Sequence, residues 1–153
     1  FTPTHKGWML IAAGTEQKHN TMTASWGSVG VLWGKYVSTI YIRPQRYTLE
    51  FVEKQDFYSL CFFDEEYRDA LKLCGSKSGR NCDKDAETGL TPAFDQAAPY
   101  YQEAKLVFIC RKLYKQDMQE SCFLDRRILD QNYPGHDLHR VFIGEIVKVL
   151  EKD

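Results

Sequence analysis

The chain has 153 residues, 43% of them hydrophobic and 14% aromatic, which is enough for one globular domain with a buried core. Its formal net charge of -1 gives none of the basic excess that marks nucleic-acid-binding proteins. No apolar run approaches the roughly 20 residues that a membrane-spanning helix needs. We therefore expect one domain over residues 1–153 that binds neither nucleic acid nor a membrane.

Strand-forming residues, either in apolar runs or in alternation, follow one another along the chain. They predict strands at 8–14, 20–27, 36–42, 56–63, 104–114 and 140–150. Residues 28–34 are rich in glycine and predict a loop with one helical turn. A glycine in the middle of the last strand, Gly144, indicates a bulge or a close approach.

Short helices are predicted between these strands from their capping residues. Thr48 is expected to cap a helix that ends near Gln55, and Asp64 one that stops at Gly75. Asp83 is expected to cap a turn that ends at Gly89, and residues 122–131 to form one or two turns. Strands and helices do not alternate regularly, so the pattern favours a mainly β, antiparallel barrel with short helical insertions.

The segment from Asn20 to Gly27 alternates as a strand does, but its polar residues carry no charge. Asn20, Thr21, Thr23 and Ser25 offer only amide and hydroxyl groups. A solvated strand face usually carries Lys or Glu, whereas short uncharged hydrogen-bonding groups suit a flat, polar, neutral ligand. This strand is therefore the first candidate binding element.

Two later segments have the composition of a phosphate site. Arg43 and Arg46 flank a proline just before the helix expected at Thr48, where free N–H groups attract anions. Ser76, Ser78, Gly79, Arg80 and Lys84 form a second cluster, in which glycine lets successive N–H groups point at one anion. The alternative readings are two surface arginines with an ordinary cap, and a flexible polar loop. Neither segment is a Walker loop or a dinucleotide fingerprint.

Together, the uncharged strand and the phosphate-like segments indicate flavin mononucleotide (FMN), which has one flat polar ring and one phosphate. His136 and His139 have the spacing of a metal pair, but no third ligand stands at a matching distance, so we expect no metal site. His139 precedes the last strand and could lie at the mouth of the barrel beside a bound ring.

The five cysteines, an odd number, form no C-x-x-C pair. Cys61 and Cys110 lie in apolar runs and are expected in the core. Cys74 and Cys82 flank the glycine loop, where a redox role is the alternative to an ordinary thiol. This cysteine pattern predicts a reducing compartment, the cytoplasm.

Four segments in order give the chain a family resemblance. They are Asn20–Trp26, Arg43–Thr48, Ser78–Arg80 with Asp83 and Lys84, and His139 with Phe142–Ile146. The chain resembles the flavin reductase-like domain proteins, in particular the flavoredoxin branch of the FMN-binding split barrels. The resemblance spans nearly the whole chain and implies a split β-barrel of Greek-key type, usually a homodimer with FMN near the subunit interface.

The resemblance also implies a set of FMN-binding positions. Asn20 to Ser25 would line the isoalloxazine ring, Arg43, Thr48, Ser78, Arg80 and Lys84 would hold the phosphate and ribityl chain, and His139 would approach the ring or a nicotinamide. Trp26 stands where the family often has a small or aliphatic residue and would stack near the ring. The full expected set is Asn20, Thr21, Met22, Thr23, Ala24, Ser25, Trp26, Arg43, Gln45, Arg46, Thr48, Ser76, Ser78, Gly79, Arg80, Lys84 and His139.

The expected function is that of an NAD(P)H:flavin oxidoreductase, in which a nicotinamide gives hydride to FMN. Hydride transfer needs no acid or base, so no catalytic residue is assigned, and His139 is named only as a candidate. The hydroxyls of Thr21, Thr23 and Ser25 are expected to stabilise the charge of reduced flavin. The alternatives are a flavoredoxin-like electron carrier with permanent FMN and a redox protein partner, and a barrel that binds a ligand without catalysis.

Overall fold

The computed structural model describes residues 7–152, and its centre is a seven-stranded antiparallel sheet. In spatial order the strands are β2 (His19–Ala24), β1 (Met9–Gly14), β5 (Phe57–Phe62), β8 (Leu106–Asp117), β9 (Arg140–Glu151), β4 (Lys35–Ile42) and β3 (Gly27–Leu32). A second sheet pairs β6 (Pro92–Ala93) with β7 (Tyr100–Tyr101). Residues 1–6 and 153 of the predicted domain lie outside the described residues.

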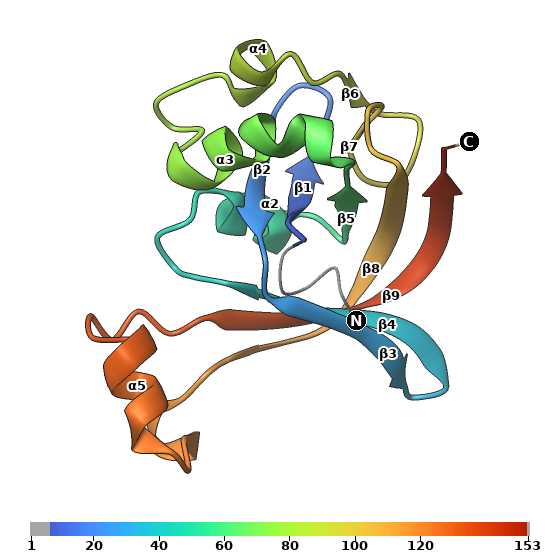
Figure 1. Cartoon of the computed structure of the whole chain (residues 1–153). Helices are drawn as coiled ribbons and strands as arrows, with labels where there is room; N and C mark the ends of the chain where they lie inside the picture. The colour runs from blue at the N-terminus through green and yellow to red at the C-terminus, as the bar shows by residue number, and fades with distance from the viewer. Residues whose placement is uncertain (1–6, 153) are drawn as a thin grey trace.

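Short helices lie between the strands. They are α2 (Thr48–Lys54), α3 (Arg68–Ser76), α4 (Lys84–Thr88) and α5 (Arg126–Asn132), with single 3₁₀ turns at Glu65–Tyr67 and Glu120–Cys122. Figure 1 shows α3 across the part of the sheet that contains β1 and β2, with α4 above it, while α5 stands apart on the segment that joins β8 to β9. The predicted antiparallel β fold with short helical insertions is confirmed.

Strand β1 is buried on both faces, which explains why its sequence is apolar throughout. Ile11 and Ala13 face the barrel core with Ile40, Leu60 and Phe142. Leu10 and Ala12 face the opposite layer, which contains Leu71 of α3, Tyr101 and Val107. Two cores therefore meet at β1, one inside the barrel, which also contains Val52 of α2, and one beneath α3.

The barrel is split because its two edge strands follow one another in the chain without pairing. β2 and β3 are at opposite ends of the strand order, and only Ser25 and Trp26 separate them. Each therefore has one backbone edge without a strand partner in the main sheet. The strand predicted at 20–27 in fact ends at Ala24, and β3 starts after this short break.

Three local predictions were wrong. Residues 28–34 form most of β3 and the turn to β4 rather than a loop, because the glycines fit an exposed edge strand and Gly34 supplies the left-handed turn at φ 70°. Thr48 does not cap α2: it is buried in the first turn and its hydroxyl accepts a hydrogen bond from Asn20. Asp64 makes no side-chain cap either, and α3 continues through Gly75 to Ser76.

Two other local predictions were confirmed. The carboxylate of Asp83 accepts hydrogen bonds from the N–H groups of Asp85 and Ala86, and Gly89 ends α4 at φ 75°. A Cβ at Gly144 would lie 2.5 Å from the hydroxyl oxygen of Tyr58, so the predicted close approach is present. That buried hydroxyl is bonded to Ser38 at 2.8 Å.

Across residues 7–152, no helix is both long enough and apolar enough to cross a membrane. The thiols of Cys61 and Cys110 are buried in the core as expected.

Candidate functional site

The candidate site begins at the backbone edge of β2 that faces away from β1, which we call the open edge. β2 pairs with β1 alone in the main sheet, and the carbonyl oxygen of Thr21 accepts a hydrogen bond from the ammonium of Lys84 at 2.6 Å. Backbone groups of alternate residues in a strand point the same way, so the N–H and C=O of Thr23 also belong to this edge. An unpaired strand edge of this kind offers a ligand alternating donors and acceptors.

A polar cavity of about 180 Å³ lies along the end of β2. It is lined by Met22, Thr23, Ala24, Ser25, Trp26, Tyr41, Arg43, Arg46 and His139. Seven of these nine residues are predicted flavin contacts from the strand and from the first arginine segment, and His139 is an eighth. The cavity thus joins three segments that are far apart in sequence, with two arginines and no carboxylate in its lining.

Arg46 places a buried guanidinium nitrogen without a partner at this cavity. Its Nη2 atom is fully buried and has no hydrogen-bond partner within residues 7–152. Burial lowers the pKa of its guanidinium from the ordinary value. A buried donor without an acceptor costs about 1–3 kcal/mol, so the position favours a ligand that supplies one.

His139 lies on the other side of the cavity, and its side chain is 6% exposed. Its Nδ1 atom is 2.6 Å from the hydroxyl oxygen of Tyr133, and the rings of Trp26 and Tyr41 lie 5.5 and 6.2 Å from its own. Burial first, and then the charge of Arg43, lowers the pKa of His139 to about 4. The imidazole is therefore neutral at physiological pH.

Arg43 lines the cavity but is already paired. Its guanidinium donates to the carboxylate of Asp137 and to the carbonyl oxygen of Asn132, both at 2.9 Å. The side-chain amide of Gln45 donates to the same Asp137 oxygen at 2.8 Å. Arg43 and Gln45 therefore hold the segment that leads to His139 in place. Both side chains have hydrogen-bond partners, in contrast to Nη2 of Arg46.

The serine-glycine loop does not gather around one point. The Arg80 guanidinium is bonded to the Glu50 carboxylate at 2.8 Å, and Ser78 accepts the N–H of Arg80 at 3.2 Å. The hydroxyl of Ser76 donates within α3 to the carbonyl oxygen of Lys72. These groups already have hydrogen-bond partners within the chain, so a phosphate site in this loop stays a prediction that the described contacts do not favour.

The structural role of Lys84 differs from the predicted one. It is 6% exposed and its ammonium donates to the carbonyl oxygens of Thr21 and Cys74, so it connects β2 to α3.

The hydroxyls of Thr21 and Thr23, which we expected to donate to the flavin, donate to backbone carbonyl oxygens instead. Thr21 donates to the carbonyl oxygen of Ile11 at 2.9 Å and Thr23 to that of Leu71 at 2.5 Å, which leaves Ser25 as the hydroxyl of the three without such a bond among the described residues.

Asn20 and Gly79 meet in a second cavity of about 300 Å³, which also borders His19, Asp83 and Asp85. An ideal Cβ on Gly79 would lie 2.1 Å from the Asn20 amide oxygen, so only glycine lets this loop approach β2 so closely. The lining of this cavity contains two carboxylates and also two lysines, Lys18 and Lys84, so its charged groups balance and give no positive excess for a phosphate.

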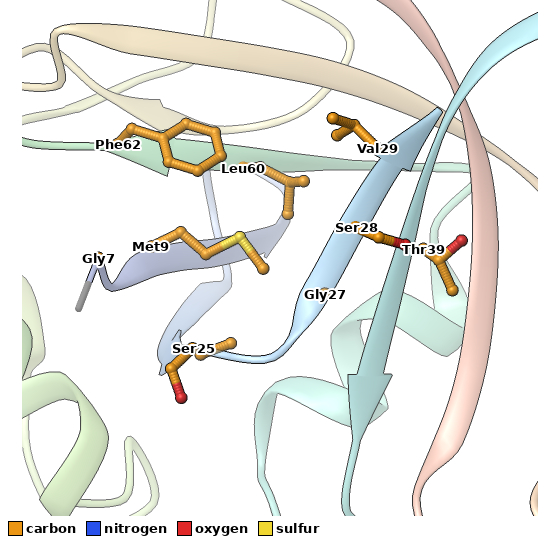
Figure 2. A pocket seen from close by; sticks show the side chains of 10 residues that line it. Gly7, Met9, Ser25, Gly27, Ser28, Val29, Thr39, Leu60 and Phe62 are labelled. Atoms are coloured by element: carbon orange, nitrogen blue, oxygen red, sulfur yellow. The ribbon is translucent and has the colours of Figure 1, made fainter. Parts of the chain in front are cut away.

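A narrow apolar notch adjoins the polar cavity and shares Ala24 and Ser25 with it. Figure 2 shows Met9 and Leu60 between β1 and β3, with Phe62 and Val29 at the same opening. Gly27 brings the backbone of β3 close to Met9, because a Cβ there would lie 3.1 Å from the methionine methyl group. This notch lies where β3 comes close to β1 and β5, and its apolar walls suit a hydrophobic ring edge.

The sequence analysis missed two residues of the site. Tyr41 lines the polar cavity, and a period-two reading backward from Arg43 could have indicated it. Tyr133 holds His139 from a turn in which no periodic pattern points inward, so no sequence signal identified it.

The residues present fit a flavin. The open edge of β2 supplies alternating donors and acceptors for the polar side of the ring, and the buried Nη2 of Arg46 lacks an acceptor. The apolar notch borders the same strand end. The donor set is neutral or cationic, as an anionic cofactor requires.

Comparison with known proteins agrees with this geometry. The model of the flavin reductase like domain matches residues 3–153, so the chain belongs to this family. A search of curated protein sequences gave no match.

Three solved structures illustrate the fold. Flavoredoxin from Methanosarcina acetivorans has a TM-score of 0.74 at 20% identity, over 95% of this chain and 68% of its own. An FMN-binding protein from Thermus thermophilus has a TM-score of 0.71 at 21% identity, over 95% of this chain and 71% of its own. A putative flavin reductase with a split barrel domain from Shewanella frigidimarina NCIMB 400 has a TM-score of 0.74 at 20% identity, over 100% of this chain and 72% of its own. The predicted family and the split-barrel fold are confirmed.

Proposed function

We propose that this chain binds FMN in the polar cavity and acts as an NAD(P)H:flavin oxidoreductase. The observation that carries the proposal is the buried, unpaired Nη2 of Arg46 beside the open edge of β2. Membership of the flavin reductase-like domain family and the hydrogen-bond donors of the cavity both support FMN as the ligand.

Each part of the cavity has a role in this proposal. The backbone of β2 orients the ring, and Arg46 donates to an acidic oxygen or a carbonyl oxygen of the cofactor. Trp26, half exposed beside His139, covers the cavity from the solvent side. Flavin, when bound, supplies two-electron chemistry, and the chain supplies binding, orientation and exclusion of water.

We further propose that the chain acts as a homodimer. Val29, Val31, Leu32, Trp33 and Tyr36 are exposed on or beside the hairpin of β3 and β4. An apolar edge strand exposed in this way is a typical association surface. β3 follows directly after Trp26, so a partner on this hairpin would border the cavity.

The test is the visible spectrum of the purified chain, with FMN supplied if the protein is colourless, before and after anaerobic addition of NADH and then NADPH. The proposal predicts a bound flavin spectrum that bleaches with at least one nicotinamide. Flavin that stays oxidised with both would indicate an electron carrier reduced by a redox protein. A protein that does not bind FMN at all would contradict the proposal.

A further inference from the structure

The hydroxyl of Tyr133 lies at hydrogen-bond distance from the imidazole of His139. The two residues come from the segment between α5 and β9, and both side chains are buried. The hydroxyl oxygen of Tyr133 is 2.6 Å from Nδ1 of His139. The same hydroxyl is 3.6 Å from the sulfur of Met118.

The hydroxyl of Tyr133 has one proton and two nearby acceptors, Nδ1 of His139 and the sulfur of Met118. A thioether sulfur is a weak acceptor, whereas an unprotonated imidazole nitrogen is a strong one, and it is also closer here by a full ångström. The Tyr133 proton therefore points at Nδ1. A neutral imidazole carries one proton, so that proton must lie on Nε2.

The surroundings oppose a second proton on the ring. The guanidinium of Arg43 lies 4.9 Å from the ring centre of Tyr133, and Arg46 lines the same cavity as His139. Asp137, the carboxylate on this side, is bonded to Arg43 and Gln45. Burial also raises the pKa of Tyr133, so its hydroxyl keeps its proton.

Nε2 is the ring nitrogen that remains for a ligand. It makes no hydrogen bond within the described part of the chain, and it is not among the fully buried polar atoms that lack a partner. His139 lines the polar cavity, so this N–H is available there.

We propose that Tyr133 is a positioning residue that fixes His139 as the neutral tautomer protonated on Nε2, and so presents a neutral hydrogen-bond donor to the polar cavity. The identity of the group that accepts this hydrogen bond rests on the proposed function, in which it is a carbonyl oxygen of the flavin or of the nicotinamide. A neutral donor of this kind polarises a carbonyl without adding a net charge to the site. No proton leaves the imidazole in this role.

The test is long-range ¹H–¹⁵N correlation spectroscopy of the chain labelled with ¹⁵N-histidine, with the His139 signals assigned by their loss in His139→Gln. At neutral pH, Nδ1 of His139 should resonate with unprotonated ring nitrogens and Nε2 with protonated ones. In Tyr133→Phe this separation should shrink, because the ring loses the bond that selects one tautomer. The phenyl ring preserves the packing against Arg43 and Phe123.

Tyr41→Phe is the matched control for these spectra. It removes a hydroxyl from another ring next to His139 that makes no bond to the imidazole, so the tautomer should not change. A wild-type His139 protonated on Nδ1, or an unchanged tautomer in Tyr133→Phe, would overturn the proposal. The spectra are recorded without flavin, and FMN titration of the wild type tests the proposed function separately.

Discussion

At the scale of single residues, Arg46 is the evidence that the polar cavity binds a ligand. Each other cation that we expected to meet the cofactor has partners within the chain: Arg43 with Asp137, Arg80 with Glu50, and Lys84 with two carbonyl oxygens. The Nη2 of Arg46 is buried and has none. A ligand acceptor would therefore relieve a cost that the folded chain otherwise carries.

Replacing Arg46 tests this directly. Arg46→Gln should weaken FMN binding by about 10-fold or more, because a charge-assisted hydrogen bond contributes about 1.5–3 kcal/mol. Fluorescence titration with FMN and with riboflavin measures the effect, and a larger loss for FMN would assign the contact to the phosphate. Arg111→Gln, an exposed arginine on β8 paired with Glu145, should bind as the wild type does. Unchanged FMN affinity in Arg46→Gln would remove Arg46 from the site.

Gly79 makes a prediction about stability. Gly79→Ala places a methyl group 2.1 Å from the side-chain amide oxygen of Asn20, whose amide nitrogen donates to the hydroxyl of Thr48. We expect a loss of about 1–3 kcal/mol in the free energy of unfolding, measured with urea. The control is Gly30→Ala, since a Cβ at Gly30 meets nothing within 4 Å. Equal stability of the two variants would mean that the loop does not pack on β2 as described.

At the scale of elements, the sequence predicted those with a strong local pattern. β1 and β4 follow from apolar and β-branched runs, and α4 follows from Asp83 and Gly89 at its ends. β3 was missed because an exposed edge strand has no buried face to impose alternation, and its glycines resemble a loop. The cap expected at Thr48 was wrong because its hydroxyl is used by Asn20, a contact that only the fold creates.

The cap of α4 can be tested. Asp83→Ala should reduce the free energy of unfolding by about 1 kcal/mol, since the carboxylate accepts two N–H groups at the start of the helix. Thermal or chemical unfolding measures this loss. Asp64→Ala is the matched control, because Asp64 occupies the corresponding position of a 3₁₀ turn without a side-chain cap, and its change should stay within about 0.5 kcal/mol. The reverse order of the two losses would contradict the assigned cap.

At the scale of the whole molecule, the sequence predicted the fold class and brought most of the polar cavity into the expected set. The ring-facing segment and the first arginine segment do meet, together with His139. The second phosphate segment was not confirmed as a cluster, since its charges pair within the chain. Charge pairing between distant segments depends on tertiary structure, so composition alone could not separate a ligand-binding cation from a paired one.

The buried histidine gives the molecule a dependence on pH. The pKa of His139 is about 4 when folded and about 6.5 when unfolded, so the unfolded chain binds more protons between these values. Its contribution to stability is therefore lost as the pH falls from about 6.5 to 4, by up to about 3 kcal/mol. Urea unfolding across this range should show a shallower pH dependence in His139→Gln.

His19 does not confound that comparison. The Asp85 carboxylate raises the pKa of His19, so the stability it contributes is present at low pH and is lost as the pH rises through the raised value. This opposite effect is present in both the wild type and His139→Gln and cancels in their difference. Parallel pH profiles for the two proteins would contradict a buried neutral His139.

The proposed homodimer makes a prediction at this scale as well. Val31 is 69% exposed on β3, and Val31→Glu would place a charge on the apolar hairpin. Light scattering after gel filtration should show that this variant is a monomer and that the wild type is a dimer. Val31→Thr is the control at the same position, because it keeps the shape without a charge and should remain dimeric. A wild type that is monomeric at all concentrations would contradict the proposal.

FMN binding by the purified chain is the central claim, and the most direct measurement is quenching of flavin fluorescence as the flavin-free protein is titrated into FMN. We predict a saturable decrease that ends at one FMN per chain, with the flavin absorbance retained on the protein after gel filtration. Fluorescence that is unchanged by excess folded protein would contradict the account, because the unpaired Arg46 and the open edge of β2 would then serve some other ligand.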